Sequence, residues 1–238
     1  MSKSAIVIGV GPLNGLGGQL ARRFSKDLHV YIAGRTLSSL EEVAYQISQE
    51  GGQVTAVQTD TRDEKQIQEL FAHVPEGDLD LAIYNVGNNT PGAIKDMDPG
   101  YFEHSWRVGC FGGFLFAKSA VNHMQGQGGT LLFTGASASM RGRAGFGAFN
   151  SSKGALRNLA QALAKECAQD GIHVGHVVVD GPIGGDKIIK GLPDFAKAKG
   201  ESGMISLQGI VDIYEMLYRQ PRNGWSFEVD VRTSEERW

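Results

Sequence analysis

The chain has 238 residues, 41% of them hydrophobic and 21% charged, with a net charge of −3 at pH 7. This length and composition suit one large α/β domain with a substantial buried core. The weakly acidic charge gives no reason to expect nucleic acid or an anionic membrane as a partner.

Short apolar runs that are typical of strands alternate with helical periodicity along the whole chain. The expected strands are residues 4–10, 30–33, 53–58, 79–84, 130–134, 174–179 and 226–231. The expected helices are residues 15–24, 37–47, 67–71, 102–124, 149–169 and 207–218. Such β–α alternation predicts an α/β fold in which helices cover both faces of a doubly wound (Rossmann-type) parallel sheet, here as a single domain over residues 1–238.

A glycine-rich turn connects the first expected strand to the first expected helix. Residues 11–17 read Gly-Pro-Leu-Asn-Gly-Leu-Gly. Glycine lets a backbone approach a pyrophosphate closely, and the start of the next helix favours negative charge. We therefore expect a dinucleotide site here, and the alternative is a turn that needs glycine only for packing. The candidate residues are Gly11, Leu13, Asn14, Gly15, Leu16 and Gly17.

The end of the second expected strand indicates which dinucleotide binds. Residues 33–36 read Ala-Gly-Arg-Thr, without the carboxylate that an NAD site uses to hold the ribose hydroxyls. Arg35 instead offers a planar cation for a 2′-phosphate, next to Thr36. The sequence therefore predicts a preference for NADP over NAD. An exposed charge at the start of a helix is the alternative interpretation of Arg35.

At this point the chain resembles the short-chain dehydrogenase/reductase family over essentially its full length. The matching segments are residues 11–17, Asp60, residues 84–87 (Tyr-Asn-Val-Gly), residues 134–137 (Thr-Gly-Ala-Ser), Lys153 and residues 180–183 (Asp-Gly-Pro-Ile). The resemblance implies a nicotinamide-dependent oxidoreductase. It also implies cofactor contacts, from the adenine to the carboxamide, at Asp60, Thr61, Asn85, Val86, Gly87, Lys153 and Ile183.

The chain departs from the family at its catalytic residues. Phe149 stands where the family has a tyrosine, and a phenyl ring has no proton to donate. Ala136 aligns with the catalytic serine and Gly109 with the helix asparagine. Of the family's catalytic tetrad only Lys153 remains, which argues against ordinary carbonyl reduction. Restoring activity is expected to require Phe149→Tyr, Ala136→Ser and Gly109→Asn together.

Three hypotheses for the function follow. The first is an NADP(H)-dependent oxidoreductase whose proton does not come from a tyrosine, with Lys153, Phe149 and the neighbouring Ser137 in the site and a small molecule as substrate. A loop hydroxyl bonded to its own backbone is the alternative for Ser137. The second hypothesis is a non-catalytic NADP-binding sensor or partner protein, and the third is a lyase or isomerase that uses the same pocket.

The remaining expectations concern the lid, the assembly and the location. Residues 184–206 follow a strand end and form either a substrate lid or a mobile surface loop. The resemblance implies a homodimer or homotetramer built on residues 102–124 and 149–169. Cys110 and Cys167 are expected to be buried and to bind no metal. The absence of a signal peptide at residues 1–4 favours a cytoplasmic protein.

Overall fold

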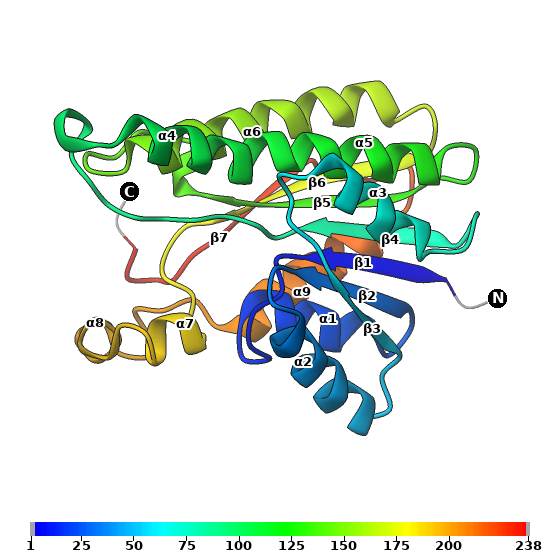
Figure 1. Cartoon of the computed structure of the whole chain (residues 1–238), viewed down its shortest axis with the longest axis horizontal. Helices are drawn as coiled ribbons and strands as arrows, with labels where there is room; N and C mark the ends of the chain where they lie inside the picture. Colours follow the sequence, from blue (N-terminus) through cyan, green and yellow to red (C-terminus); the bar gives the residue numbers. More distant parts are fainter. Residues whose placement is uncertain (1–2, 237–238) are drawn as a thin grey trace.

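Seven parallel strands form one sheet in the order β3-β2-β1-β4-β5-β6-β7 in a computed structural model that describes residues 3–236. Helices cover both faces of this sheet, as Figure 1 shows. The doubly wound α/β fold and the single domain expected from the sequence are confirmed. Met1 and Ser2, where the segment examined for a signal peptide begins, lie outside the described residues.

The first half of the chain follows the expected alternation. Its elements are β1 (Ser4–Ile8), α1 (Leu16–Phe24), β2 (His29–Gly34), α2 (Leu37–Gln49), β3 (Val54–Gln58), α3 (Glu64–Ala72) and β4 (Leu79–Tyr84). β1 is shorter than expected because Gly9 follows it with φ = +88°, a left-handed backbone conformation. A Cβ at Gly9 would also lie 2.3 Å from the backbone oxygen of Asn85, so two strand ends meet closely there.

The second half of the chain contains a helical segment that the sequence pattern predicts as one helix and that the structure divides into three parts. Residues 102–124 were expected as a single helix, but α4 (Pro99–Trp106) and α5 (Gly112–Met124) are joined by a π-helical turn, η2 (Arg107–Phe111). The remaining elements are η1 (Ile94–Asp96), β5 (Gly129–Ala136), η3 (Ser137–Ser139), α6 (Gly147–Cys167), β6 (Ile172–Val179), α7 (Asp186–Ile189), α8 (Pro193–Lys199), α9 (Leu207–Tyr218) and β7 (Glu228–Val231).

Two apolar layers hold the helices to the sheet. Leu20 of α1 and Ile210 of α9 pack in the layer on one face, and Phe71 of α3, Phe116 of α5 and Leu156 of α6 pack in the other. All five side chains are fully buried. Burying such side chains contributes roughly 1.5–3 kcal/mol each, so these layers fix where the strands end.

The carboxyl ends of the parallel strands lie together on one edge of the sheet, at the left of Figure 1. The two short helices α7 and α8 lie beside this edge. Both helices belong to residues 184–206, the segment predicted as a substrate lid or a mobile surface loop. In the part of the chain from residue 3 to residue 236, no helix has the length and apolar character needed to cross a membrane.

Candidate functional site

The glycine-rich turn leads directly into the start of α1. The helix begins after Gly15, no acidic side chain lies in its first turn, and the backbone N–H of Gly15 donates to the oxygen of Pro12 at 2.9 Å. A Cβ at Gly17 would lie 2.7 Å from the oxygen of Gly9 and 2.9 Å from the Cα of Val10. Gly17 is therefore required by the packing of the turn. The unobstructed helix start can accept a phosphate group.

The base of residues 184–206 is attached to this turn. The backbone N–H of Asp186 donates to the oxygen of Asn14 at 2.8 Å, and the backbone N–H of Gly184 donates to the oxygen of Ile205 at 2.8 Å. Ile183 forms an isolated bridge with Ile205. Ile183 therefore lies at the strand edge beside the turn, in the position at which the carboxamide contact was predicted.

Arg35 and Thr36 lie exposed immediately after β2. Among residues 3–236 no side chain is hydrogen-bonded to the Arg35 guanidinium, although its backbone oxygen accepts from Gln58 at 2.9 Å. At the end of β3 the Asp60 carboxylate pairs with Arg62 at 2.5 Å, and the hydrogen bond from Arg62 lowers the pKa of Asp60. Arg35 is thus the exposed cation that remains available to a ligand at these two strand ends.

Asn85 joins three strand ends through its side chain. Its Nδ2 donates to the Gly9 oxygen at 3.1 Å and its Oδ1 accepts from the Thr134 hydroxyl at 2.9 Å. That hydroxyl also pairs with the hydroxyl of Tyr214 at 2.6 Å. The Asn85 side chain is therefore engaged by the protein, and it holds the β1–β4 crevice in shape. Ligands of open α/β sheets bind in such a crevice.

Lys153 is buried beneath the loop that follows β4. Its ammonium donates to the backbone oxygens of Thr134 at 2.7 Å and of Val86 at 3.1 Å, and its side chain is 4% exposed. Burial lowers the pKa of Lys153 to about 8, because the charged form loses its hydration. A Cβ at Gly87 would lie 3.3 Å from Nζ, so the backbone at Gly87 packs directly on the ammonium.

Phe149 lies at the same place, one helical turn before Lys153 on α6. A Cβ at Gly87 would lie 4.0 Å from the Phe149 ring as well as 3.3 Å from Nζ. The structure therefore brings Phe149, Lys153 and Gly87 together. Ser137 begins η3, directly after Ala136 at the end of β5, and its hydroxyl has no hydrogen-bond partner among the described residues. It is therefore open to a substrate oxygen.

Ser152 corrects one expectation about restoring the tetrad. A Cβ at Gly109 would lie 1.6 Å from the Ser152 hydroxyl oxygen, and Ser152 is buried. Gly109→Asn therefore requires the Ser152 hydroxyl to rotate away or Ser152 to be replaced by a smaller residue. The π-helical turn that contains Gly109 is also bonded to the sheet, because the Tyr84 hydroxyl donates to the Val108 oxygen at 2.5 Å.

The sequence analysis missed one charged network beside this site. The Nδ1 of His176 on β6 lies 2.9 Å from the Glu228 carboxylate, which also accepts from Arg157 at 2.6 and 2.8 Å. The pairing depends on the β6–β7 register, in which His176 is opposite Glu228. In the sequence, this network is indicated only by the presence of a histidine and a glutamate in two consecutive predicted strands.

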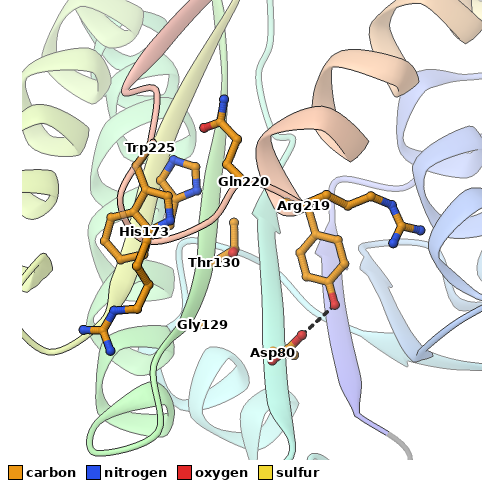
Figure 2. Close-up of a pocket in the computed structure, with 9 residues that line it drawn as sticks. Asp80, Gly129, Thr130, His173, Arg219, Gln220 and Trp225 are labelled. Atoms are coloured by element: carbon orange, nitrogen blue, oxygen red, sulfur yellow. Dashed lines mark hydrogen bonds between the residues drawn. The ribbon is translucent and has the colours of Figure 1, made fainter.

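A separate pocket of about 430 Å³ opens at the opposite, amino-terminal edge of the sheet (Figure 2). Its walls include the stacked rings of His173 and Trp225 and the pair between the Tyr218 hydroxyl and Asp80, 2.5 Å apart. None of the predicted site residues lines it. Within residues 3–236 no cluster of histidine, cysteine, aspartate or glutamate could hold a metal ion.

Comparison with known proteins identifies the class of protein that carries this site. Residues 3–183 match the description short chain dehydrogenase. Versicolorin reductase 1 of Aspergillus parasiticus is 30% identical over 74% of this chain and 68% of its own length. The chain therefore belongs to the short-chain dehydrogenase family, and it is an NAD(P)-dependent oxidoreductase of that type.

Two solved structures have a fold similar to that of this protein over almost the whole chain. A short-chain dehydrogenase from Rhodopseudomonas palustris has a TM-score of 0.78 and 28% identity, covering 96% of this chain and 98% of its own. An alcohol dehydrogenase from Thermococcus sibiricus, complexed with 5-hydroxy-NADP, has a TM-score of 0.84, covering 99% of this chain and 98% of its own. At 22% identity the second shows the shared fold alone.

Proposed function

We propose that this protein is an NADP(H)-dependent oxidoreductase that transfers hydride to or from a small molecule without a catalytic tyrosine. The observation that carries the NADP preference is Arg35, exposed at the end of β2. A guanidinium there matches the charge and planar geometry of a 2′-phosphate. The nucleotide would lie across the carboxyl edge, from Arg35 and the glycine turn to Lys153 and Ile183.

The chemistry follows from what the site retains and what it lacks. A nicotinamide bound here would supply or accept the hydride, so the protein must orient the substrate and, respectively, deliver or remove one proton. Phe149 cannot exchange that proton. Lys153 would bind the ribose hydroxyls, as the resemblance to the family implies, and the Ser137 hydroxyl would offer a contact for a substrate oxygen. The proton therefore comes from water, from the substrate or from another side chain such as Lys153.

The two other hypotheses have weaker support. A sensor without catalysis and a lyase or isomerase both retain the pocket, but the relatives that match this chain are named as reductases or dehydrogenases. A cytoplasmic location also remains a prediction.

The NADP preference is tested by measuring the dissociation constants of NADPH and NADH for the native protein and for Arg35→Asp. Loss of a charge-assisted phosphate contact costs about 1.5–3 kcal/mol, so NADPH should bind Arg35→Asp about 10- to 100-fold more weakly, with NADH little affected. Gln58→Ala removes the neighbouring hydrogen bond to the Arg35 backbone and serves as the control. Equal NADPH and NADH constants in the native protein would refute the preference.

We also propose that α4, η2, α5 and α6 form the contact of a homodimer or homotetramer. Phe116 and Leu156 of the predicted contact are buried against the sheet, but Phe102, Trp106 and Phe114 are about 40% exposed. Phe111 stacks between Trp106 and Phe114, which makes these side chains one aromatic surface. Phe114→Glu should lower the mass measured by light scattering. Met216→Glu, equally exposed on α9, should leave it unchanged, and a monomeric native protein would contradict the proposal.

A further inference from the structure

A buried histidine covers the segment of β5 that binds Lys153. His176 is 0% exposed, and its register partner on β5 is Phe133, which packs in the same apolar layer as Leu156 of α6. Register partners point to the same face of a sheet, so the imidazole lies between the sheet and α6. Its Nε2 lies 2.2 Å from where a Cβ at Gly135 would be. Only glycine at residue 135 leaves room for this ring.

The neighbouring carboxylate determines which ring nitrogen carries the proton. The hydrogen bonds from Arg157 lower the pKa of Glu228, which is therefore an anion and can only accept. Burial lowers the pKa of His176 to about 4, so the ring is neutral at pH 7. From this network we assign the proton to Nδ1, which donates to Glu228. Nε2 then carries the lone pair.

Lys153 of α6 lies on the same face of the sheet and donates to the backbone directly before Gly135. Two of its ammonium protons are donated to the oxygens of Thr134 and Val86, which leaves one. Thr134 and Gly135 are consecutive, so the Lys153 ammonium and the Nε2 lone pair lie near the same short piece of β5 backbone. Among the described residues Nε2 has no hydrogen-bond partner, and the two nitrogens are not in direct hydrogen-bond contact.

We propose that in the protein without cofactor His176 is a positioning residue for Lys153, with one water between the two side chains accepting the third ammonium proton and donating to Nε2. A polar gap longer than a direct hydrogen bond is commonly bridged in this way. Within residues 3–236, the charged groups that act on the ring are Glu228 from β7 and Lys153 and Arg157 from α6. The ring also stacks on Phe227 and lies beside Phe133 and Gly135 of β5. Glu228 and Arg157 therefore orient the ring, and its lone pair stabilises the Lys153 ammonium.

The test measures the ionisation of Lys153 in the protein without cofactor or substrate, so it does not depend on the proposed function. The 13Cε resonance of Lys153, assigned by its loss in Lys153→Arg, is followed by NMR from neutral to alkaline pH. In His176→Phe the pKa of Lys153 should fall by about one unit, because an acceptor is lost. His173→Phe, a matched change of a buried histidine on the same strand, should leave it unchanged. An unchanged pKa in His176→Phe would overturn the proposal.

Glu228→Gln separates the action of the ring from that of the carboxylate charge. If Glu228 acts on Lys153 through the imidazole ring, Glu228→Gln should lower the pKa of Lys153 in the native background. The same change should have a smaller effect on this pKa in the His176→Phe background. A double-mutant cycle measures this coupling. Equal shifts in both backgrounds would mean that the carboxylate acts by charge alone, against the proposal. Should His176→Phe not fold, the 15N spectrum of His176 in the native protein decides, because a proton on Nε2 would also refute it.

Discussion

The two halves of this sheet match the predicted short-chain dehydrogenase pattern to different extents. On the β1–β4 side the glycine turn, Arg35 and the Asn85 hydrogen bonds form the crevice in which we propose that the dinucleotide binds. On the β5–β7 side and in the adjoining η2, the positions that the family resemblance aligns with the catalytic tyrosine, serine and asparagine hold Phe149, Ala136 and Gly109.

This difference teaches that binding and chemistry can change separately within one fold. The cofactor side depends on backbone geometry, which tolerates few substitutions. The predicted catalytic side depends on a few side chains, whose aligned positions are packed among other side chains in this protein. Ser152 occupies the space beside Gly109, and the His176–Glu228–Arg157 network lies next to Lys153. The β5–β7 side is therefore packed around its own set of residues.

The largest expected effect is on the cofactor side. Gly17→Ala places a Cβ against two backbone atoms that cannot rotate away, 2.7 and 2.9 Å distant. Such overpacking costs about 1–3 kcal/mol, so we expect NADPH to bind up to about 100-fold more weakly and the melting temperature to fall. Isothermal titration calorimetry and thermal unfolding measure the two effects.

The matched control for this change is Gly154→Ala in α6, where a Cβ meets no atom within 4 Å. It should retain NADPH affinity and stabilise the protein by about 0.5–1 kcal/mol, because alanine restricts the unfolded chain and favours the helix. If both variants bound NADPH like the native protein, the glycine turn would not be the dinucleotide site.

The buried ammonium of Lys153 should make stability depend on pH. Its pKa is about 8 in the folded protein and about 10.4 when unfolded, so between these values the unfolded chain binds more protons and stability rises with pH. The free energy of unfolding of the native protein relative to Lys153→Met should therefore increase by about 2–3 kcal/mol between pH 7 and 10.5.

Urea unfolding at several pH values measures this difference. Lys165→Met, an exposed position on the same helix, controls for the loss of a lysine. A difference between native and Lys153→Met that is constant with pH would show that the ammonium is not buried as described.

The smallest expected effect is that of Phe149→Tyr alone. Positioned acid catalysis contributes about two to four powers of ten, but only when substrate and proton donor are aligned. Without a serine at Ala136, the single change should raise ketone reduction less than about tenfold. A clear gain should need Ala136→Ser and Gly109→Asn, with Ser152→Gly to make room for the asparagine. A gain of a hundredfold or more from Phe149→Tyr alone would contradict this.

The fold was predictable because its signals are local. Apolar runs in the sequence predicted the strands β1 to β7, and the glycine spacing predicted the turn before α1. The contacts that decide the chemistry are not local. Ser152 meets Gly109 only through the packing of α6 on η2, and His176 meets Glu228 only through strand register. The π-helical turn η2 was not predicted either, because its residues continue the pattern of an ordinary helix. Lys153 was identified by resemblance, but its burial became visible only in the structure.

The central claim is that the chemistry of this protein takes place around Lys153 without a tyrosine. The most direct test measures NADPH oxidation by the native protein and by Lys153→Ala on a panel of simple ketones. The structure predicts weak or no turnover by the native protein, and loss of any turnover in Lys153→Ala. Rapid reduction by the native protein that Lys153→Ala leaves unchanged would show that the active site lies elsewhere.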